Sequence, residues 1–94
     1  MIRHVIMWKF RPGEEESMHR FLEGLKALDG QIPQILHMEV GVSCSEKNNF
    51  DACLIADFES PEALAAYQND PRHVAVSSLC KSIRLERAAV DFEL

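Results

Sequence analysis

Hydrophobic and polar side chains alternate along residues 2–10. One side of this segment is mostly apolar and consists of Ile2, His4, Ile6, Trp8 and Phe10. The other side mixes apolar and charged groups and consists of Arg3, Val5, Met7 and Lys9. A period of two, rich in β-branched and aromatic residues, predicts a β-strand. Because both sides carry apolar groups, we expect both faces of this strand to be covered.

The pattern then changes to the period of a helix over residues 14–28. One apolar stripe is formed by Met18, Phe21, Leu22, Leu25 and Leu28, with the spacing of a helix that buries a single face. Acidic residues 14–16 fall in the first turn, where the helix dipole favours negative charge. Gly30 and Pro33 are expected to end the helix.

Two strands, over residues 35–42 and 50–59, are predicted next, with a polar loop between them. Ser60 and Pro61 are typical of a helix start, and this helix is expected to reach about residue 69. Asp70 and Pro71 interrupt it, and a second helical piece is expected over residues 72–82.

The chain closes with a further alternating segment, residues 83–94, which we interpret as the last strand. The order β-α-β-β-α-β predicts one domain over residues 1–94. Its class is α+β, a ferredoxin-like arrangement of a four-stranded antiparallel sheet with helices on one face. The other face carries apolar groups and has no helix to cover it. A second copy of the chain is the expected cover, through an isologous sheet-to-sheet contact.

Composition narrows the function classes further. The chain has 94 residues, of which 47% are hydrophobic, and a net charge of −5, which argues against a phosphate-backbone binder such as a nucleic-acid module. Three cysteines without a C-x-x-C pair give neither a disulfide framework nor a zinc ribbon. We find no continuous apolar segment for a signal peptide or a membrane span, so a cytoplasmic location is expected.

Several segments together resemble one known family. They are the opening IRHVIMWKF, the helix start SPEAL, the segment YQNDPRHV and the closing AAVDFEL. In this order they resemble the stress-responsive A/B barrel domain family (Dabb). The resemblance implies that two ferredoxin-like subunits pack sheet to sheet as a dimeric α+β barrel.

The same resemblance implies a site. One characterised plant member of the family is a polyketide cyclase that works by aldol condensation without a metal or organic cofactor. Tyr67 and His73 match the positions of its catalytic tyrosine and histidine, and His4 and Asp91 match positions that line or support its pocket. A further histidine of that enzyme is replaced here by Ala52.

The residues themselves also indicate how this site would be built. The first and last strands of such a sheet are antiparallel neighbours, so His4 and Asp91 are expected to meet on one sheet face. A histidine and a tyrosine hydroxyl lining one pocket suit proton abstraction beside a carbonyl, with His73 as base and Tyr67 polarising the oxygen. In the alternative, structural interpretation His73 bonds a backbone carbonyl, and His4 with Asp91 joins two strands.

Other polar residues indicate a functional site less clearly. His19 is expected on the exposed side of the first helix, and His37 is placed to pair with Glu39. Arg87 is interpreted as an anion contact or as a solvated or interface charge. Cys53 is expected to be a buried small apolar group. No pair of histidines has the spacing of a helical metal site, so no metal is predicted.

Three hypotheses of function remain from the sequence. The first is a homodimer that binds a small apolar ligand. The second is a cofactor-free cyclase or lyase that uses His73 and Tyr67. The third is a protein-interaction module with a closed interior and no pocket. Monooxygenases of the same barrel superfamily, which need no cofactor, are a further option that no sequence feature favours.

Overall fold

The computed structural model describes all residues from 1 to 94. Its elements follow one another as β1 (Ile2–Phe10), α1 (Glu15–Leu28), β2 (His37–Val42), β3 (Ala52–Phe58), α2 (Pro61–Asn69), α3 (Pro71–Ile83) and β4 (Arg84–Glu93). The predicted ferredoxin-like α+β fold is therefore confirmed, with the second helix divided in two. No helix is long and apolar enough to cross a membrane.

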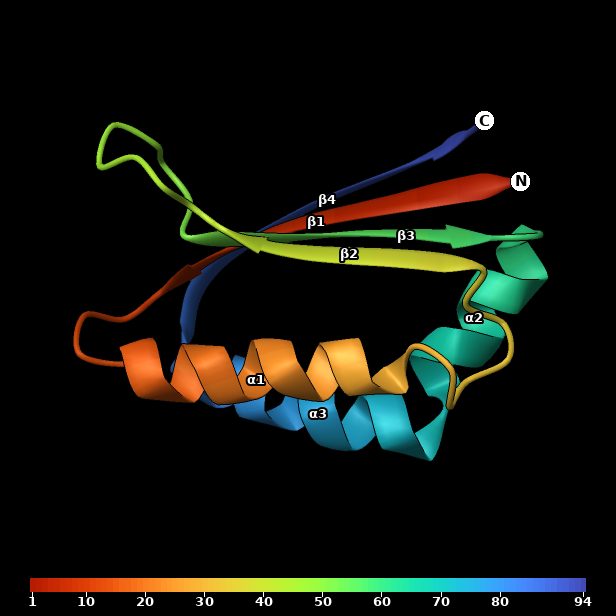
Figure 1. Cartoon of the computed structure of the whole chain (residues 1–94), viewed down its shortest axis with the longest axis horizontal. Coiled ribbons are helices and arrows are strands. Elements are labelled where there is room, and N and C mark those ends of the chain that lie inside the picture. The colour runs from red at the N-terminus through yellow and green to blue at the C-terminus, as the bar shows by residue number, and fades with distance from the viewer.

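The four strands form one antiparallel sheet in the order β2-β3-β1-β4. Figure 1 shows α1 and α3 side by side beneath this sheet, while its upper face has no helix over it. β1 is central and β4 is an edge strand. The first and last elements of the chain are thus neighbours, which brings residues from both ends of the sequence together.

The core lies between the sheet and the helices. The side of β1 that carries Ile2, His4, Ile6, Trp8 and Phe10 faces inward, and the apolar stripe of α1 packs against it. Trp8 meets Phe21 edge to face with ring centroids 5.0 Å apart. Aromatic pairs favour this geometry. The inward position of His4 in this otherwise apolar row makes it a buried polar residue.

The two predicted helix starts, at Ser60 with Pro61 and at Asp70 with Pro71, are confirmed by their hydrogen bonds. Ser60 Oγ accepts from the Ala63 backbone N–H at 3.1 Å, and Pro61 is the first residue of α2. The Asp70 carboxylate accepts from the Arg72 N–H at 2.8 Å, and Pro71 opens α3. Proline cannot donate a helical hydrogen bond, and it restricts the preceding residue to an extended conformation. The chain therefore turns sharply between α2 and α3.

β2 and β3 are both shorter than the hydrophobic pattern predicts. The backbone N–H of Ile35 bonds to the Ile32 carbonyl, so this buried residue belongs to a turn and β2 begins only at His37. Asp51 uses its carboxylate to accept from the Phe10 N–H at 2.8 Å, so β3 begins at Ala52. Ile35 is thus buried outside the sheet, and Phe50 precedes the first paired residue of β3.

The sheet face away from the helices carries exposed apolar groups and two polar pairs. Met7, Val90 and Phe92 are among its exposed apolar side chains. Cys53 lies opposite Met7 on this face and is half-buried, so the expectation of a buried Cys53 is wrong. The reason is the alternation of β3, which turns Leu54 into the core and Cys53 outward. Cys80 of α3 is the buried cysteine.

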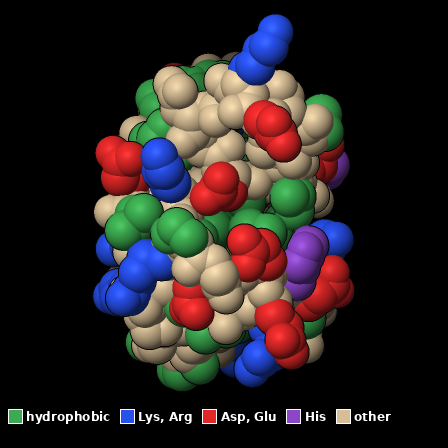
Figure 2. All heavy atoms as spheres, turned by 90° about the vertical axis from the view of Figure 1, so that its left-hand side faces the viewer, with side chains coloured by type: hydrophobic (Ala, Val, Ile, Leu, Met, Phe, Trp, Pro, Cys, Tyr) green, Lys and Arg blue, Asp and Glu red, His purple; other side chains and the backbone are tan.

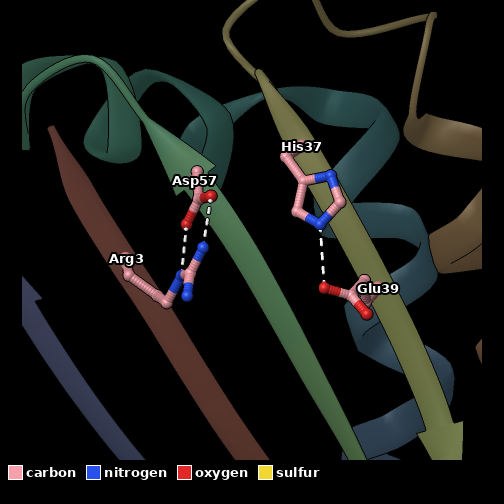
Figure 3. A network of polar contacts seen from close by, with 4 residues as sticks. All are labelled: Arg3, His37, Glu39 and Asp57. Atoms are coloured by element: carbon pink, nitrogen blue, oxygen red, sulfur yellow. Dashed lines mark hydrogen bonds and ion pairs between the residues drawn. The ribbon is translucent and has the colours of Figure 1, made fainter. Parts of the chain in front are cut away.

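Figure 3 shows the two polar pairs of this face, Arg3 with Asp57 and His37 with Glu39. Arg3 donates two hydrogen bonds to the Asp57 carboxylate, at 2.8 and 2.9 Å. Those hydrogen bonds hold the pKa of Asp57 below its usual value. His37 Nε2 lies 2.8 Å from a carboxylate oxygen of Glu39, so the predicted pair is present.

Candidate functional site

His4 and Asp91 face each other across β1 and β4. His4 Nδ1 lies 2.5 Å from an Asp91 carboxylate oxygen. The imidazole is only 2% exposed, whereas the Asp91 side chain is 45% exposed. The structure therefore brings these two residues together as the strand topology predicts, with the carboxylate at the edge of the sheet and the ring inside.

Tyr67 and His73 form the second pair of the candidate site. Tyr67 lies near the end of α2 and His73 near the start of α3, and the turn at Pro71 brings their rings within 4.4 Å between centroids. Tyr67 is 1% exposed and also packs on Phe58 at 5.0 Å. His73 is half-buried.

The hydrogen bonds of both histidines determine which ring nitrogen carries the proton. His73 Nδ1 lies 3.1 Å from the Gln68 carbonyl oxygen, which can only accept a hydrogen bond. An ionised Asp91 carboxylate is likewise an acceptor for His4 Nδ1. In the neutral state both rings therefore hold the proton on Nδ1, and Nε2 carries the free lone pair.

Burial favours the uncharged forms of Tyr67 and His73 at neutral pH. Desolvation raises the pKa of Tyr67 to about 12, so its hydroxyl is a donor at neutral pH. Burial also lowers the pKa of His73; the hydrogen bond to the Gln68 carbonyl and the charge of Asp70 oppose this effect, and the charges of His4 and Arg87 add to it. The pair thus presents a neutral imidazole next to a protonated phenol, which are the states a base and a hydrogen-bond donor need.

A small cavity of about 50 Å³ lies between the sheet and the helices at this pair. Tyr67 and His73 both line it, together with Ile6, Trp8 and Leu54 of the sheet. Pockets for drug-sized ligands have volumes of roughly 300–1,000 Å³. The cavity therefore accommodates only a small group unless the surrounding side chains move.

Two larger hollows lie elsewhere. One of about 740 Å³ is bounded by the turn after β1 and the loop between β2 and β3. Figure 2 looks at this end of the molecule and shows acidic and basic side chains interspersed around small apolar areas. A second hollow, of about 480 Å³, lies on the helix-free face beside Met7 and Cys53. Neither contains a predicted site residue, and no three His, Cys, Asp or Glu side chains gather closely enough to hold a metal ion.

Sequence reasoning missed three residues at the small cavity, Ser77, Cys80 and Arg84. His73, Ser77 and Cys80 follow a spacing of four and three residues, which places them on one face of α3, and Arg84 follows directly after the end of that helix. This helical spacing is the feature of the sequence from which these residues could have been predicted. Arg87 also lines the cavity, on the helix-facing side of β4 opposite Trp8.

Comparisons with known proteins agree with this architecture. The family model described as the stress-responsive A/B barrel domain matches residues 2–94. No curated protein matches the sequence.

Solved structures with the same fold come from several organisms. A dimeric protein of unknown function with a ferredoxin-like fold from Bacteroides fragilis is 26% identical, with a TM-score of 0.93 over 99% of this chain and 95% of that one. A Dabb family protein with a ferredoxin-like fold from Mesorhizobium loti is 22% identical, with a TM-score of 0.81 over 99% and 95% of the two chains. A hydroxynitrile lyase from Passiflora edulis is 9% identical, with a TM-score of 0.84 over 97% and 90%. The last two likenesses are of fold alone.

Proposed function

The chain belongs to the stress-responsive A/B barrel domain family, and from this premise we propose that it is a homodimer that binds a small carbonyl compound. We place the ligand between sheet and helices, where His73 and Tyr67 would move a proton on it without a cofactor. The observation that carries this proposal is the contact of a neutral imidazole with a buried phenol, 4.4 Å between ring centroids, on a cavity.

The proposed chemistry follows from the two protonation states. His73 Nε2 takes a proton from the carbon next to the carbonyl group, and the electron pair of that C–H bond moves to the carbonyl oxygen. The Tyr67 hydroxyl donates a hydrogen bond to this oxygen as negative charge develops on it. The enolate carbon then adds to a second carbonyl group, as in an aldol cyclisation, and the oxygen of that group takes the proton back from His73. The same steps in reverse break a carbon–carbon bond, as in a lyase.

His4 and Asp91 act as positioning residues in this proposal. The carboxylate accepts the Nδ1 proton of His4 and so holds the ring in one tautomer and one orientation. The His4 ring also packs edge to face against Phe58, which in turn contacts Tyr67. His4 and Asp91 do not line the cavity, so in this proposal they support its wall and do not exchange a proton with the ligand.

Dimer formation through the helix-free sheet face has two supports. Similar structures from Bacteroides fragilis and Thermobifida fusca are described as dimeric. The face itself exposes Met7, Val90 and Phe92, and removing such side chains from water favours association. A second copy would thereby complete the thin core of a chain of 94 residues.

The lyase from Passiflora edulis indicates that this fold can host an enzyme. Fold alone does not assign an activity, so the proposal depends on the side chains of the present site. An interaction module with a closed interior would not need a histidine and a tyrosine on an internal cavity.

Exchange of the α-protons of butanone in D₂O tests the proposal, because it requires only the proton-transfer step. Loss of the α-proton signals is followed by ¹H NMR with and without the protein in the same buffer. We expect acceleration by the wild type and loss of most of it, by roughly a hundredfold, in His73→Gln. Tyr67→Phe removes only the hydroxyl and is expected to slow the exchange as well.

The control for this experiment is His19→Gln, which removes an exposed imidazole of α1 outside the site. Exchange should be unchanged in this variant. Equal exchange with wild type, His73→Gln and free buffer would overturn the proposal.

A further inference from the structure

Two guanidinium groups lie at the same small cavity as Tyr67 and His73. Arg84 stands where α3 passes into β4, and Arg87 follows it on the helix-facing side of β4. Both line the cavity. Their convergence results from the topology, because the end of α3 and the start of β4 both reach the side of the pocket away from Asp91.

Neither arginine is neutralised by a carboxylate of the chain. The six ion pairs of the structure engage Arg3, His4, Arg20, Lys26, His37 and Arg72 as their basic partners. The sequence has 15 acidic residues against 10 lysines and arginines, so carboxylates are in excess. Two unpaired cations therefore remain next to an internal cavity of an acidic protein.

The positive charges of Arg84 and Arg87 also affect the pKa values of side chains that line the cavity. The charge of Arg87 contributes to the lowered pKa of His73, whose main cause is burial. Burial raises the pKa of the Cys80 thiol, and the charges of Arg84 and Arg87 oppose that rise. Both arginines are therefore near enough to act on groups that line the cavity.

We infer that Arg84 and Arg87 bind the carboxylate of an oxo acid whose carbonyl group lies between Tyr67 and His73. This inference rests on the proposed function and names its substrate class. A guanidinium fork matches a planar carboxylate and forms paired, charge-assisted hydrogen bonds with it. Anchoring the carboxylate would orient the carbonyl group toward the phenol and the imidazole.

The size of the cavity agrees with a ligand whose carbonyl end enters it and whose carboxylate stays on the arginine side. A volume of about 50 Å³ takes the carbonyl end of a short chain. The charged end stays on the arginine side, where Arg87 is exposed and Arg84 is half-buried. A carboxylate at this position keeps partial contact with water and avoids the cost of full burial of a charge.

The test compares levulinate, a stable oxo acid, with its neutral methyl ester, using the full-length protein at low ionic strength and neutral pH. Binding is followed by calorimetry and by NMR shifts of His73 and Tyr67. We expect levulinate to bind at least about tenfold more tightly than methyl levulinate. Arg87→Gln and Arg84→Gln should each remove most of this preference and leave the binding of the ester unchanged.

Arg20→Gln is the matched control, because it removes the same charge from an exposed position on α1. It should keep the preference for levulinate. Equal binding of acid and ester, no binding of levulinate, or the same loss in Arg20→Gln would overturn the inference.

The butanone experiment separates this result from the proposed function. Exchange of butanone with no arginine-dependent preference for levulinate would overturn the carboxylate site alone. An arginine-dependent preference without butanone exchange would support the carboxylate site and overturn the proton-transfer step.

Discussion

His4 and Asp91 are 87 residues apart in the sequence, yet His4 Nδ1 lies 2.5 Å from the Asp91 carboxylate. The pair joins the first and last strands of the chain at the sheet edge nearest the candidate site. Since His4 is buried, its Nδ1–H depends on Asp91 as its acceptor. Both the stability of the fold and the geometry of the pocket should therefore depend on this pair.

Replacement of Asp91 should show this dependence. Asp91→Ala leaves the buried Nδ1–H of His4 without its partner, and we expect a loss of about 1–3 kcal/mol in the free energy of unfolding. Asp91→Asn keeps an oxygen acceptor and should lose less. Urea unfolding at one fixed protein concentration measures both. Equal stability of Asp91→Ala and the wild type would contradict the structural role of the pair.

The pKa of Tyr67 can be measured without interference, because it is the only tyrosine of the chain. We expect the phenolate absorbance of the folded protein to rise with a midpoint near pH 12. The unfolded chain in denaturant should titrate near the ordinary value of about 10. Because the folded pKa is raised, this group's contribution to stability is present below the unfolded pKa and is lost as pH rises toward the folded value. A folded-state midpoint near 10 would show that Tyr67 is not buried.

The tautomer of His73 is a second prediction for solution measurement. Nitrogen-15 shifts should place the proton on Nδ1, which donates to the Gln68 carbonyl, and His73→Gln assigns the signals. The midpoint of the titration should lie below the pKa of an ordinary histidine, about 6.5. Because the folded pKa is lowered, the stability contribution of neutral His73 is present above the unfolded pKa and is lost as pH falls through the folded value. A raised midpoint, or a proton on Nε2, would remove His73 as the proposed base.

The helix-free sheet face gives a prediction for the oligomeric state. Val90 on this face is 58% exposed and Val74 on α3 is 50% exposed, so they form a matched pair of valines. Light scattering should give about twice 10.7 kDa for the wild type and for Val74→Glu. Val90→Glu should shift the equilibrium toward monomer, since it places a charge in the contact. A monomeric wild type, or equal effects of the two substitutions, would contradict this interface.

Much of the fold follows from the sequence because its signals are local. The alternation of β1, the stripe of α1 and the proline starts of α2 and α3 each predict an element without knowledge of the rest. The strand boundaries near Ile35 and Phe50 could not be predicted in the same way. Apolar residues are found in buried turns as well as in sheets, so the hydrophobic pattern alone extends a predicted strand too far.

The candidate site was predictable only in part. Strand topology is sufficient to bring His4 and Asp91 together, and the short turn at Pro71 is sufficient to bring Tyr67 near His73. The contribution of Arg84 depends on where α3 ends and β4 begins. Its meeting with Arg87 depends on a register shift in the pairing of β1 with β4, which sets Arg84 opposite Phe10 and Arg87 opposite Trp8. Such tertiary details leave no periodic signal in the chain.

The most direct test of the account is the rate of butanone α-proton exchange in a double-mutant cycle of Tyr67→Phe and His73→Gln. If the two side chains act together on one carbonyl group, the double variant should be no slower than His73→Gln alone, and both should be near the rate in buffer. Exchange by the double variant at the wild-type rate would contradict the claim that these two residues move the proton.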